Sequence, residues 1–170
     1  MKKYELTDTH IEHLGRTLHQ IRALRDIEGA GVAAGDLGGY IEKAENLSQD
    51  DNAWVYGDAR VYGDAWVCGN ARVSDNARVS DNARVCGDCD LLVISNLGSR
   101  NDTTTFFRLE IGGIGVGCGC FSGTIDEFES RVKDVHGDNQ HGRACAAAIE
   151  MARKVVNAEA VTEDGDEHGK

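Results

Sequence analysis

Proline is absent from the 170 residues of this sequence, and aromatic residues make up only 6% of it. Without proline, tight turns have to be formed by Gly, Asn and Asp, which tolerate the positive φ angles of such turns. Long apolar runs are absent too: no stretch approaches the roughly 20 residues of a membrane-spanning helix. No apolar signal region follows Met1 to Glu5. We therefore expect a cytoplasmic protein that makes no contact with a membrane.

Positive charge is also in short supply. The chain has 18 Lys and Arg against 29 Asp and Glu, which gives a net charge of −11. Residues 34–90 carry the largest share of the excess, with eleven acidic and five basic residues. An acidic surface repels phosphate, so direct nucleic-acid binding is not expected. The same charge either keeps a protein soluble or lets it compete with nucleic acid for a basic groove on a partner.

Six cysteines without a signal region indicate a reducing compartment and free thiols. Two pairs, Cys86 with Cys89 and Cys118 with Cys120, are close enough in sequence to suggest a four-thiolate zinc site. The second pair is spaced too tightly for the usual zinc knuckle, however. Small buried thiols are the alternative that we favour, and we expect neither a metal nor a cofactor.

The most informative feature is a six-residue unit that occurs six times between Asn52 and Gly87 without a slip. A short fixed period is typical of a solenoid. Because side chains alternate along a strand, the alanine and the valine of each unit point the same way, into a narrow core. These inward positions are Ala53, Ala59, Ala65, Ala71, Ala77 and Ala83 together with Val55, Val61, Val67, Val73, Val79 and Val85.

The pattern resembles the hexapeptide repeat of left-handed parallel β-helices, in which three units make one triangular coil. The resemblance implies a β-helix over residues 34–90, with an irregular coil over residues 34–51 ahead of the exact units. Residues 18 apart would then stack, as in any parallel ladder. The stacked pairs would be Trp54 over Arg72 and Trp66 over Arg84, both candidate cation–π pairs, together with Arg60 over Arg78 and Cys68 over Cys86.

A wider resemblance links the chain to phage and prophage proteins that are labelled hexapeptide-repeat or polymer-forming cytoskeletal proteins. The matching segments are residues 33–48, 98–106, 118–128 and 136–143. The resemblance implies no particular chemistry. It does imply self-association, because proteins with this repeat often form trimers; a dimer through the C-terminal domains is the alternative.

Residues 1–33 are expected to cap the open end of the solenoid, which would otherwise pair with other chains. Two structures are open for this cap. Ile11, Leu14, Leu18 and Ile21 have helical spacing. The family resemblance instead favours a β-hairpin that turns near Leu14 and Gly15.

Residues 91–158 are expected to form a small α+β domain, so that the whole chain is mainly β, and residues 159–170 an acidic tail. Thr124 and Glu127 match the capping box of a helix, and Gly137 is suited to end it. The apolar positions of a second helix are Cys145, Ala148, Ile149, Ala152 and Val156. The expected elements are strands at 91–95, 105–111 and 114–121 and helices at 124–137 and 142–157.

Two polar stretches are candidate binding sites. The first, from Gly98 to Thr105, offers backbone N–H groups, hydroxyl groups and one guanidinium that suit a phosphate or carboxylate. Its candidate residues are Ser99, Arg100, Asn101, Thr103, Thr104 and Thr105. The second stretch lies between the expected helices and contributes His136, His141 and Arg143. In each case the alternative is a turn whose polar side chains bond to their own backbone.

The resemblance to phage proteins, together with the acidic charge, implies a non-enzymatic binding protein, encoded by a phage in a bacterial host, that inhibits a host defence system such as a CRISPR nuclease. A host protein, rather than nucleic acid itself, would be its partner. A sponge for a small anionic or nucleotide ligand is one alternative. An acyltransferase of the hexapeptide class is another, but such enzymes place a catalytic His beside the coils, and residues 34–90 contain no His.

Overall fold

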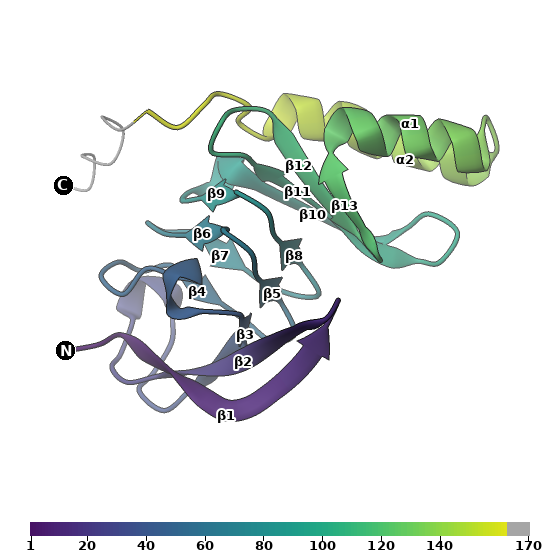
Figure 1. Cartoon of the computed structure of the whole chain (residues 1–170). Helices are drawn as coiled ribbons and strands as arrows, with labels where there is room; N and C mark the ends of the chain where they lie inside the picture. The colour runs from purple at the N-terminus through teal and green to yellow at the C-terminus, as the bar shows by residue number, and fades with distance from the viewer. Residues whose placement is uncertain (163–170) are drawn as a thin grey trace.

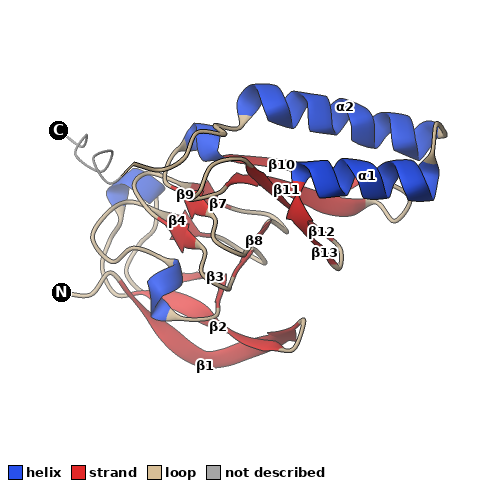
Figure 2. Cartoon of the chain, turned by 45° about the horizontal axis from the view of Figure 1, so that its top comes forward, coloured by secondary structure: helices blue, strands red, loops and turns tan. Residues whose placement is uncertain are grey.

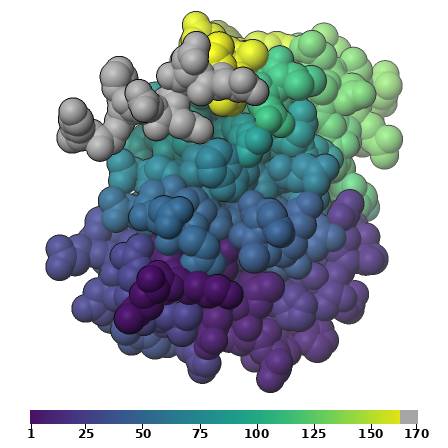
Figure 3. All heavy atoms as spheres, turned by 60° about the vertical axis from the view of Figure 1, so that its left-hand side comes forward, coloured from purple at the N-terminus to yellow at the C-terminus, as the bar shows by residue number. Residues whose placement is uncertain are grey.

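The computed structural model describes residues 1–162; residues 163–170, most of the predicted acidic tail, lie outside the described residues. Three parts follow one another along the molecule in chain order (Figure 1). An N-terminal β-hairpin comes first, a stack of very short parallel strands second, and an antiparallel sheet covered by two helices third. The space-filling view shows the same succession from one end of the molecule to the other (Figure 3).

The N-terminal cap is a hairpin, not a helix. Strands β1 (Tyr4–His13) and β2 (Arg16–Ala23) pair antiparallel, and the turn between them is Leu14–Gly15, both with positive φ. Strand β2 then pairs with β3 (Leu37–Ile41), which starts the solenoid. A 3₁₀ turn at Glu28–Ala30 lies between these two strands.

A buried lysine ties the hairpin to the solenoid. The side chain of Lys3 is fully buried, and its Nζ donates to the backbone oxygens of Asp51 and Ala53 at 3.2 and 2.9 Å. The carboxylate of Asp51, 3.2 Å away, balances its charge. Burial nevertheless lowers the pKa of Lys3, because it removes the ammonium group from water. A buried ammonium is tolerated only with such partners, so Lys3 fixes the first residues against the coil.

The solenoid is built from two-residue strands that pair in parallel with the strand one coil later. The strands are β4 (Trp54–Val55), β5 (Arg60–Val61), β6 (Trp66–Val67), β7 (Arg72–Val73), β8 (Arg78–Val79) and β9 (Arg84–Val85). The pairs are β3–β5–β8, β4–β7 and β6–β9. Each pair of exact units joins residues 18 apart, as predicted, for example Trp54 with Arg72. The coil is thus triangular: the exact units place one pair of strands on each face, and β3 adds a third strand beside β5 and β8.

The predicted inward positions form the core. Every repeat alanine and valine is at most 1% exposed. The last residue of the first five units turns a corner with positive φ: Gly57, Gly63, Gly69, Asp75 and Asp81 have φ between 55° and 68°. Gly and Asp tolerate this conformation, which explains their position in the repeat.

The irregular coil ahead of the exact units is two residues longer than they are. Tyr40 pairs with Arg60 and Leu47 with Val67, each 20 residues apart. A 3₁₀ turn at Ala44–Asn46 takes up the additional length. The amide of Asn46 is buried and donates to the backbone oxygens of Gly63 and Ala65, so the extra turn is bonded to the next coil.

The upper end of the solenoid is closed by the antiparallel sheet β10 (Leu91–Leu97), β11 (Asp102–Arg108), β12 (Ile114–Cys118) and β13 (Phe121–Thr124). Alternation along β11 sends Phe107 into the solenoid core and Phe106 into a second core on the other face. The hydroxyl of Thr105 accepts a hydrogen bond from the backbone N–H of Arg78 at 2.9 Å. The expected single strand over residues 114–121 is wrong, because Gly119, with φ of 58°, breaks it into a hairpin.

Helices α1 (Ile125–His136) and α2 (Gln140–Val155) lie side by side over the outer face of this sheet (Figure 2). The predicted capping box is present: Thr124 accepts from the N–H of Glu127, whose carboxylate accepts from the N–H of Thr124. Gly137 ends the first helix and Asn139 caps the second. All five predicted apolar positions of α2 are buried. The helical spacing of Ile125, Phe128, Val132 and Val135 predicts an apolar stripe on the first helix, but Val135 is 61% exposed.

Candidate functional site

A pocket of about 280 Å³ opens at one end of the C-terminal domain. The turn between β10 and β11, the turn between β12 and β13, and helix α1 surround it. Its apolar wall consists of Leu97, Phe121, Phe128, Val132 and Val135. Its polar groups are Ser99, Arg100, Asp102, Thr104, Arg131 and His136. The site therefore combines an apolar wall with two guanidinium groups, one imidazole and one carboxylate.

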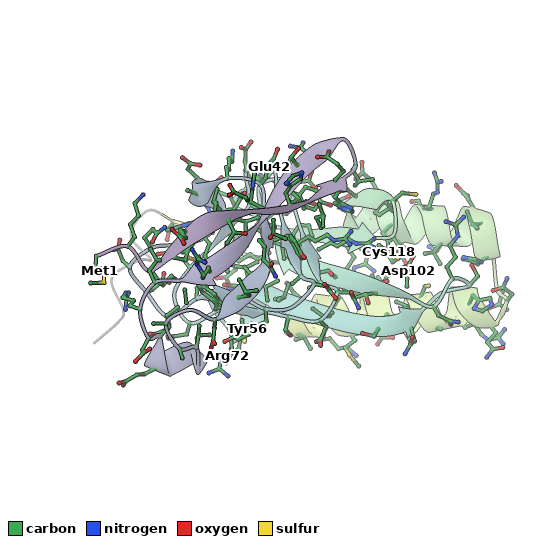
Figure 4. All side chains as sticks on the ribbon, turned by 90° about the horizontal axis from the view of Figure 1, so that it is seen from below. Met1, Glu42, Tyr56, Arg72, Asp102 and Cys118 are labelled. Carbon is green, nitrogen blue, oxygen red and sulfur yellow. A yellow bond between two sulfur atoms is a disulfide. The ribbon has the colours of Figure 1, made fainter. Side chains whose placement is uncertain are left out.

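Two tight turns place the polar groups at the mouth. The first holds Gly98 and Asn101 with positive φ, and the N–H of Asn101 donates to the oxygen of Gly98 at 3.4 Å. This turn leaves Ser99 and Arg100 exposed. The second turn carries Gly119, and a Cβ there would lie 3.0 Å from the carboxylate of Asp102. Asp102 and Cys118 thus lie at the same end of the sheet, as the view from below also shows (Figure 4).

Helix α1 forms the opposite wall. Phe128 and Val132 face inward, and Phe128 packs against Phe106 and Phe121 with ring centroids 6.2 and 5.3 Å apart. Arg131 and Val135 follow at helical spacing and therefore border the opening. Within residues 1–162, neither Arg100 nor Arg131 forms a salt bridge.

Three thiols lie along the pocket, at Cys118, Cys120 and Cys145. The hydroxyl of Thr104 donates to the sulfur of Cys118 at 3.1 Å. Burial raises the pKa of the Cys118 thiol and of the Cys145 thiol. Both therefore stay protonated near neutral pH, whereas a nucleophilic cysteine needs a lowered pKa.

The structure brings together four of the predicted site residues: Ser99, Arg100, Thr104 and His136 all line the pocket. The rest of the first stretch is not the loop that we expected, because β11 starts at Asp102. Successive β-branched threonines favour a strand, whose alternation turns Thr104 toward the pocket and its neighbours Thr103 and Thr105 toward the solenoid side.

The remaining predicted residues lie around the pocket rather than in it. Asn101 is exposed at the turn. His141 is exposed on α2, with its ring centroid 5.8 Å from that of His136. Arg143 donates to the backbone oxygen of Asp138, which closes the connection between the helices.

Sequence reasoning missed Asp102, Arg131 and the pocket role of Cys118. Arg131 carried a usable signal, since it lies three residues after Phe128 and four before Val135 on the predicted helix. A residue at that spacing borders the apolar stripe. No comparable signal linked Cys118 to the turn at residues 98–101, because the two meet only through the pairing of β11 with β12.

The expectation of free thiols is wrong for one pair. Cys68 and Cys86 stack on successive coils, as predicted, and form a disulfide. Cys89 is exposed within a 3₁₀ turn at Asp88–Asp90 that follows the last exact unit. The four-thiolate zinc set is therefore not assembled, and no group of three or more potential ligands occurs in the part of the chain that the structure covers.

One of the two predicted cation–π pairs is present. The guanidinium of Arg84 lies over the ring of Trp66, 4.8 Å from its centroid. Arg72 instead donates to the backbone oxygen of Gly29 at 2.6 Å. Trp54, predicted to point outward, is buried under the N-terminal segment and meets the ring of Tyr4 edge-on.

The coils match a family model described as YdcK beta solenoid repeat, over residues 53–69 and 71–87. The prediction of a mainly β chain built on a β-solenoid is therefore confirmed. No curated protein matches the chain. Across residues 1–162, no helix combines the length and the apolar character needed to cross a membrane.

Proposed function

We propose that the chain is a binding protein rather than an enzyme, in which a rigid solenoid carries a C-terminal domain that holds a small anionic ligand. The observation that carries this proposal is the pocket beside α1. Its guanidinium groups at Arg100 and Arg131 suit a phosphate or carboxylate, and its apolar wall at Phe121 and Phe128 suits a ring or a short chain. A nucleotide combines both chemistries.

Two features favour binding over catalysis. The pocket thiols at Cys118 and Cys145 have raised pKa values, so they are poor nucleophiles. The coils contain no His between residues 34 and 90. The catalytic His of an acyltransferase would therefore have to come from the C-terminal domain, for example His136. An acyl-CoA contains both a nucleotide and an acyl chain, so it is included among the ligands tested below.

The hand of the coils is also part of our proposal. The six-residue period with alternating Ala and Val is typical of left-handed coils, and we propose that hand here. We also propose a phage origin, a cytoplasmic location in the bacterial host and a homo-oligomer, either a trimer along the solenoid or a dimer through the C-terminal domains.

Calorimetry tests the pocket. Cyclic nucleotides and acyl-CoA are titrated into the wild type, into the double variant Arg100→Gln/Arg131→Gln, and into Arg143→Gln as a matched control outside the pocket. Charge-assisted hydrogen bonds contribute roughly 1.5–3 kcal/mol each, so the double variant should bind at least about tenfold more weakly. The control should match the wild type. Equal affinity in the double variant, or no heat with any of these ligands, would remove the proposal.

A second candidate is inhibition of a nucleic-acid-binding host defence protein, such as a CRISPR nuclease. It is supported by the net charge of −11 and by the excess of eleven acids over five bases in residues 34–90. A stoichiometric mixture of the two proteins should show reduced nuclease activity that added salt restores. Normal activity of the nuclease in that mixture counts against inhibition, and it leaves the pocket proposal untouched.

A further inference from the structure

Two arginines stack on one face of the solenoid without a carboxylate between them. Arg60 on β5 and Arg78 on β8 are register partners on successive coils. Like charges directly opposite each other destabilise a ladder. Three other cations next to the solenoid are paired with carboxylates: Arg16 with Glu42, Lys43 with Asp64 and Arg84 with Glu110, at 2.9, 2.9 and 2.8 Å. Arg72 donates to the backbone oxygen of Gly29 instead. Over residues 1–162, Arg60 and Arg78 form no such pair, although the chain is strongly acidic.

Most of their donors are unused. A guanidinium group has five N–H donors. Arg60 uses one of them toward Nδ1 of His13, at 2.9 Å, and Arg78 uses one toward the backbone oxygen of Gly119. No other side-chain hydrogen bond of either arginine occurs among the residues that the structure describes. Both side chains are only partly buried, so a ligand can reach them.

His13 adds a third donor without an acceptor. It is the last residue of β1, next to the turn of the hairpin, and its ring meets that of Tyr62 edge-on. Because Nδ1 accepts from Arg60, the proton of the neutral ring belongs on Nε2. Nε2 is buried and has no hydrogen-bond partner. Burial, together with Arg60 and Arg78, lowers the pKa of His13 to about 4, so the ring is neutral at physiological pH.

Two carboxylates on this side of the solenoid are already engaged. Glu42 accepts from Arg16 and from the N–H of Gly63 at 2.7 Å. Asp81 accepts from the hydroxyls of Ser80 and Ser122 at 3.2 and 2.7 Å. The cluster of Arg60, Arg78 and His13 is therefore rich in donors, and neither arginine forms a salt bridge among residues 1–162.

We propose that Arg60 and Arg78 bind an oxyanion of the phosphate class, with His13 holding Arg60 in position. Neighbouring strands lie roughly 4.8 Å apart, so a tetrahedral oxyanion can accept from both guanidinium groups at once. The site lies on the solenoid face at β5 and β8 and adjoins the pocket beside α1, because Arg78 donates to the backbone oxygen of Gly119, which lines that pocket. The two proposals are tested by different variants, at Arg60 and Arg78 here and at Arg100 and Arg131 for the pocket, so either can fail without the other.

The test is a titration of inorganic phosphate into the full chain at constant ionic strength, followed through the ring signals of His13 by NMR. The His13→Gln variant identifies those signals by their loss. The wild type should show a saturable shift. Arg60→Gln/Arg78→Gln should weaken phosphate binding at least tenfold, whereas the matched control Arg72→Gln, which has the same place in its unit on another face, should not.

If the double variant does not fold, Arg60→Lys and Arg78→Lys replace it, since each keeps the charge but loses the forked donor geometry. A weaker saturable shift in these variants supports the site. Titration of a nucleoside monophosphate in parallel distinguishes free phosphate from a nucleotide phosphate, and either order of affinity supports the site. A shift that never saturates, or one that is the same in the arginine variants and the wild type, overturns it.

Discussion

Alanine and valine alternate through the interior of the exact coils, whereas the C-terminal domain is filled by Phe106, Phe128, Cys145 and Ile149 and keeps a pocket of about 280 Å³ open at one end. Repetition leaves the coils no room for a cavity, because each inward position stacks on an identical one. The irregular domain has no such constraint. The difference teaches that an exact repeat fills its own interior, whereas the irregular domain has space for the pocket in which we propose a ligand.

The largest predicted effect is that of a substitution in the core of the regular coils. Val61 is fully buried and stacks between Ile41 and Val79 on the neighbouring coils. Val61→Asp would bury an unpaired carboxylate, at a cost of about 4 kcal/mol or more, which is comparable to the whole stability of many domains. We expect no cooperative melting transition by circular dichroism. The matched control, Arg60→Gln on the outward side of the same strand, should melt cooperatively, and wild-type melting of Val61→Asp would contradict the stacked core.

The next effect concerns the disulfide, which belongs to the solenoid alone. Cys68 and Cys86 are 18 residues apart and are joined, while Cys89, Cys118, Cys120 and Cys145 are free. Closing a loop of this size stabilises a fold by about 3 kcal/mol through the unfolded chain. A reducing agent should therefore lower the melting temperature of the oxidised wild type and leave Cys68→Ser/Cys86→Ser unchanged. A thiol assay on the denatured, oxidised protein should count four free groups, and a count of six would show that the bond does not form.

A smaller effect is expected at the junction of the two regions. A Cβ on Gly115 would lie 2.2 Å from the ring of Phe107, which closes the solenoid core. Gly115→Ala forces this ring to move, and overpacking of this kind costs about 1–3 kcal/mol. Gly87→Ala is the control, because the nearest atom to its Cβ would be 4.0 Å away. Chemical denaturation compares the two, and equal midpoints would mean that the junction is loosely packed.

The sequence predicted the features that depend on spacing within the chain. The period of six defined the inward Ala and Val positions and the pairing of residues 18 apart, because a parallel coil repeats one local geometry. The capping box at Thr124 and Glu127 and the apolar face of α2 were likewise local patterns. In all of these, a residue's role follows from neighbours that are close to it in sequence or related by the fixed repeat.

What the sequence did not reveal depends on contacts between distant segments. Trp54 has the outward position of its unit but is buried, because residues from the N-terminal segment cover it. The pocket combines Arg100, Cys118 and Arg131, which come from a turn, a strand end and a helix. The Cys68–Cys86 bond was hidden for a different reason: stacking was predicted, but the choice between two thiols and a disulfide does not follow from spacing.

The smallest predicted effect is a pH dependence of stability that arises at the other end of the solenoid, where His13 of the hairpin contacts the coil. Its pKa is lowered from 6.5 to about 4, first by burial and then by Arg60 and Arg78. Above pH 6.5 the ring is neutral in both the folded and the unfolded chain. Between pH 6.5 and 4 the unfolded chain gains a proton that the folded chain does not, so stability falls as the pH is lowered. Because the ring is partly open to solvent, we expect a loss on the order of 1 kcal/mol.

The measurement for His13 is the unfolding free energy from urea titrations at pH 7.5 and pH 5, for the wild type and for His13→Gln. The variant should lose less stability over this interval, because it lacks the group that titrates. Carboxylates add their own pH dependence mainly below about pH 4.5 and act alike in both proteins, so the difference between the two isolates His13. His19→Gln on the same hairpin is the matched control. If the wild type and His13→Gln lose equal stability, then His13 titrates normally and the contact between the hairpin tip and Arg60 is open to water.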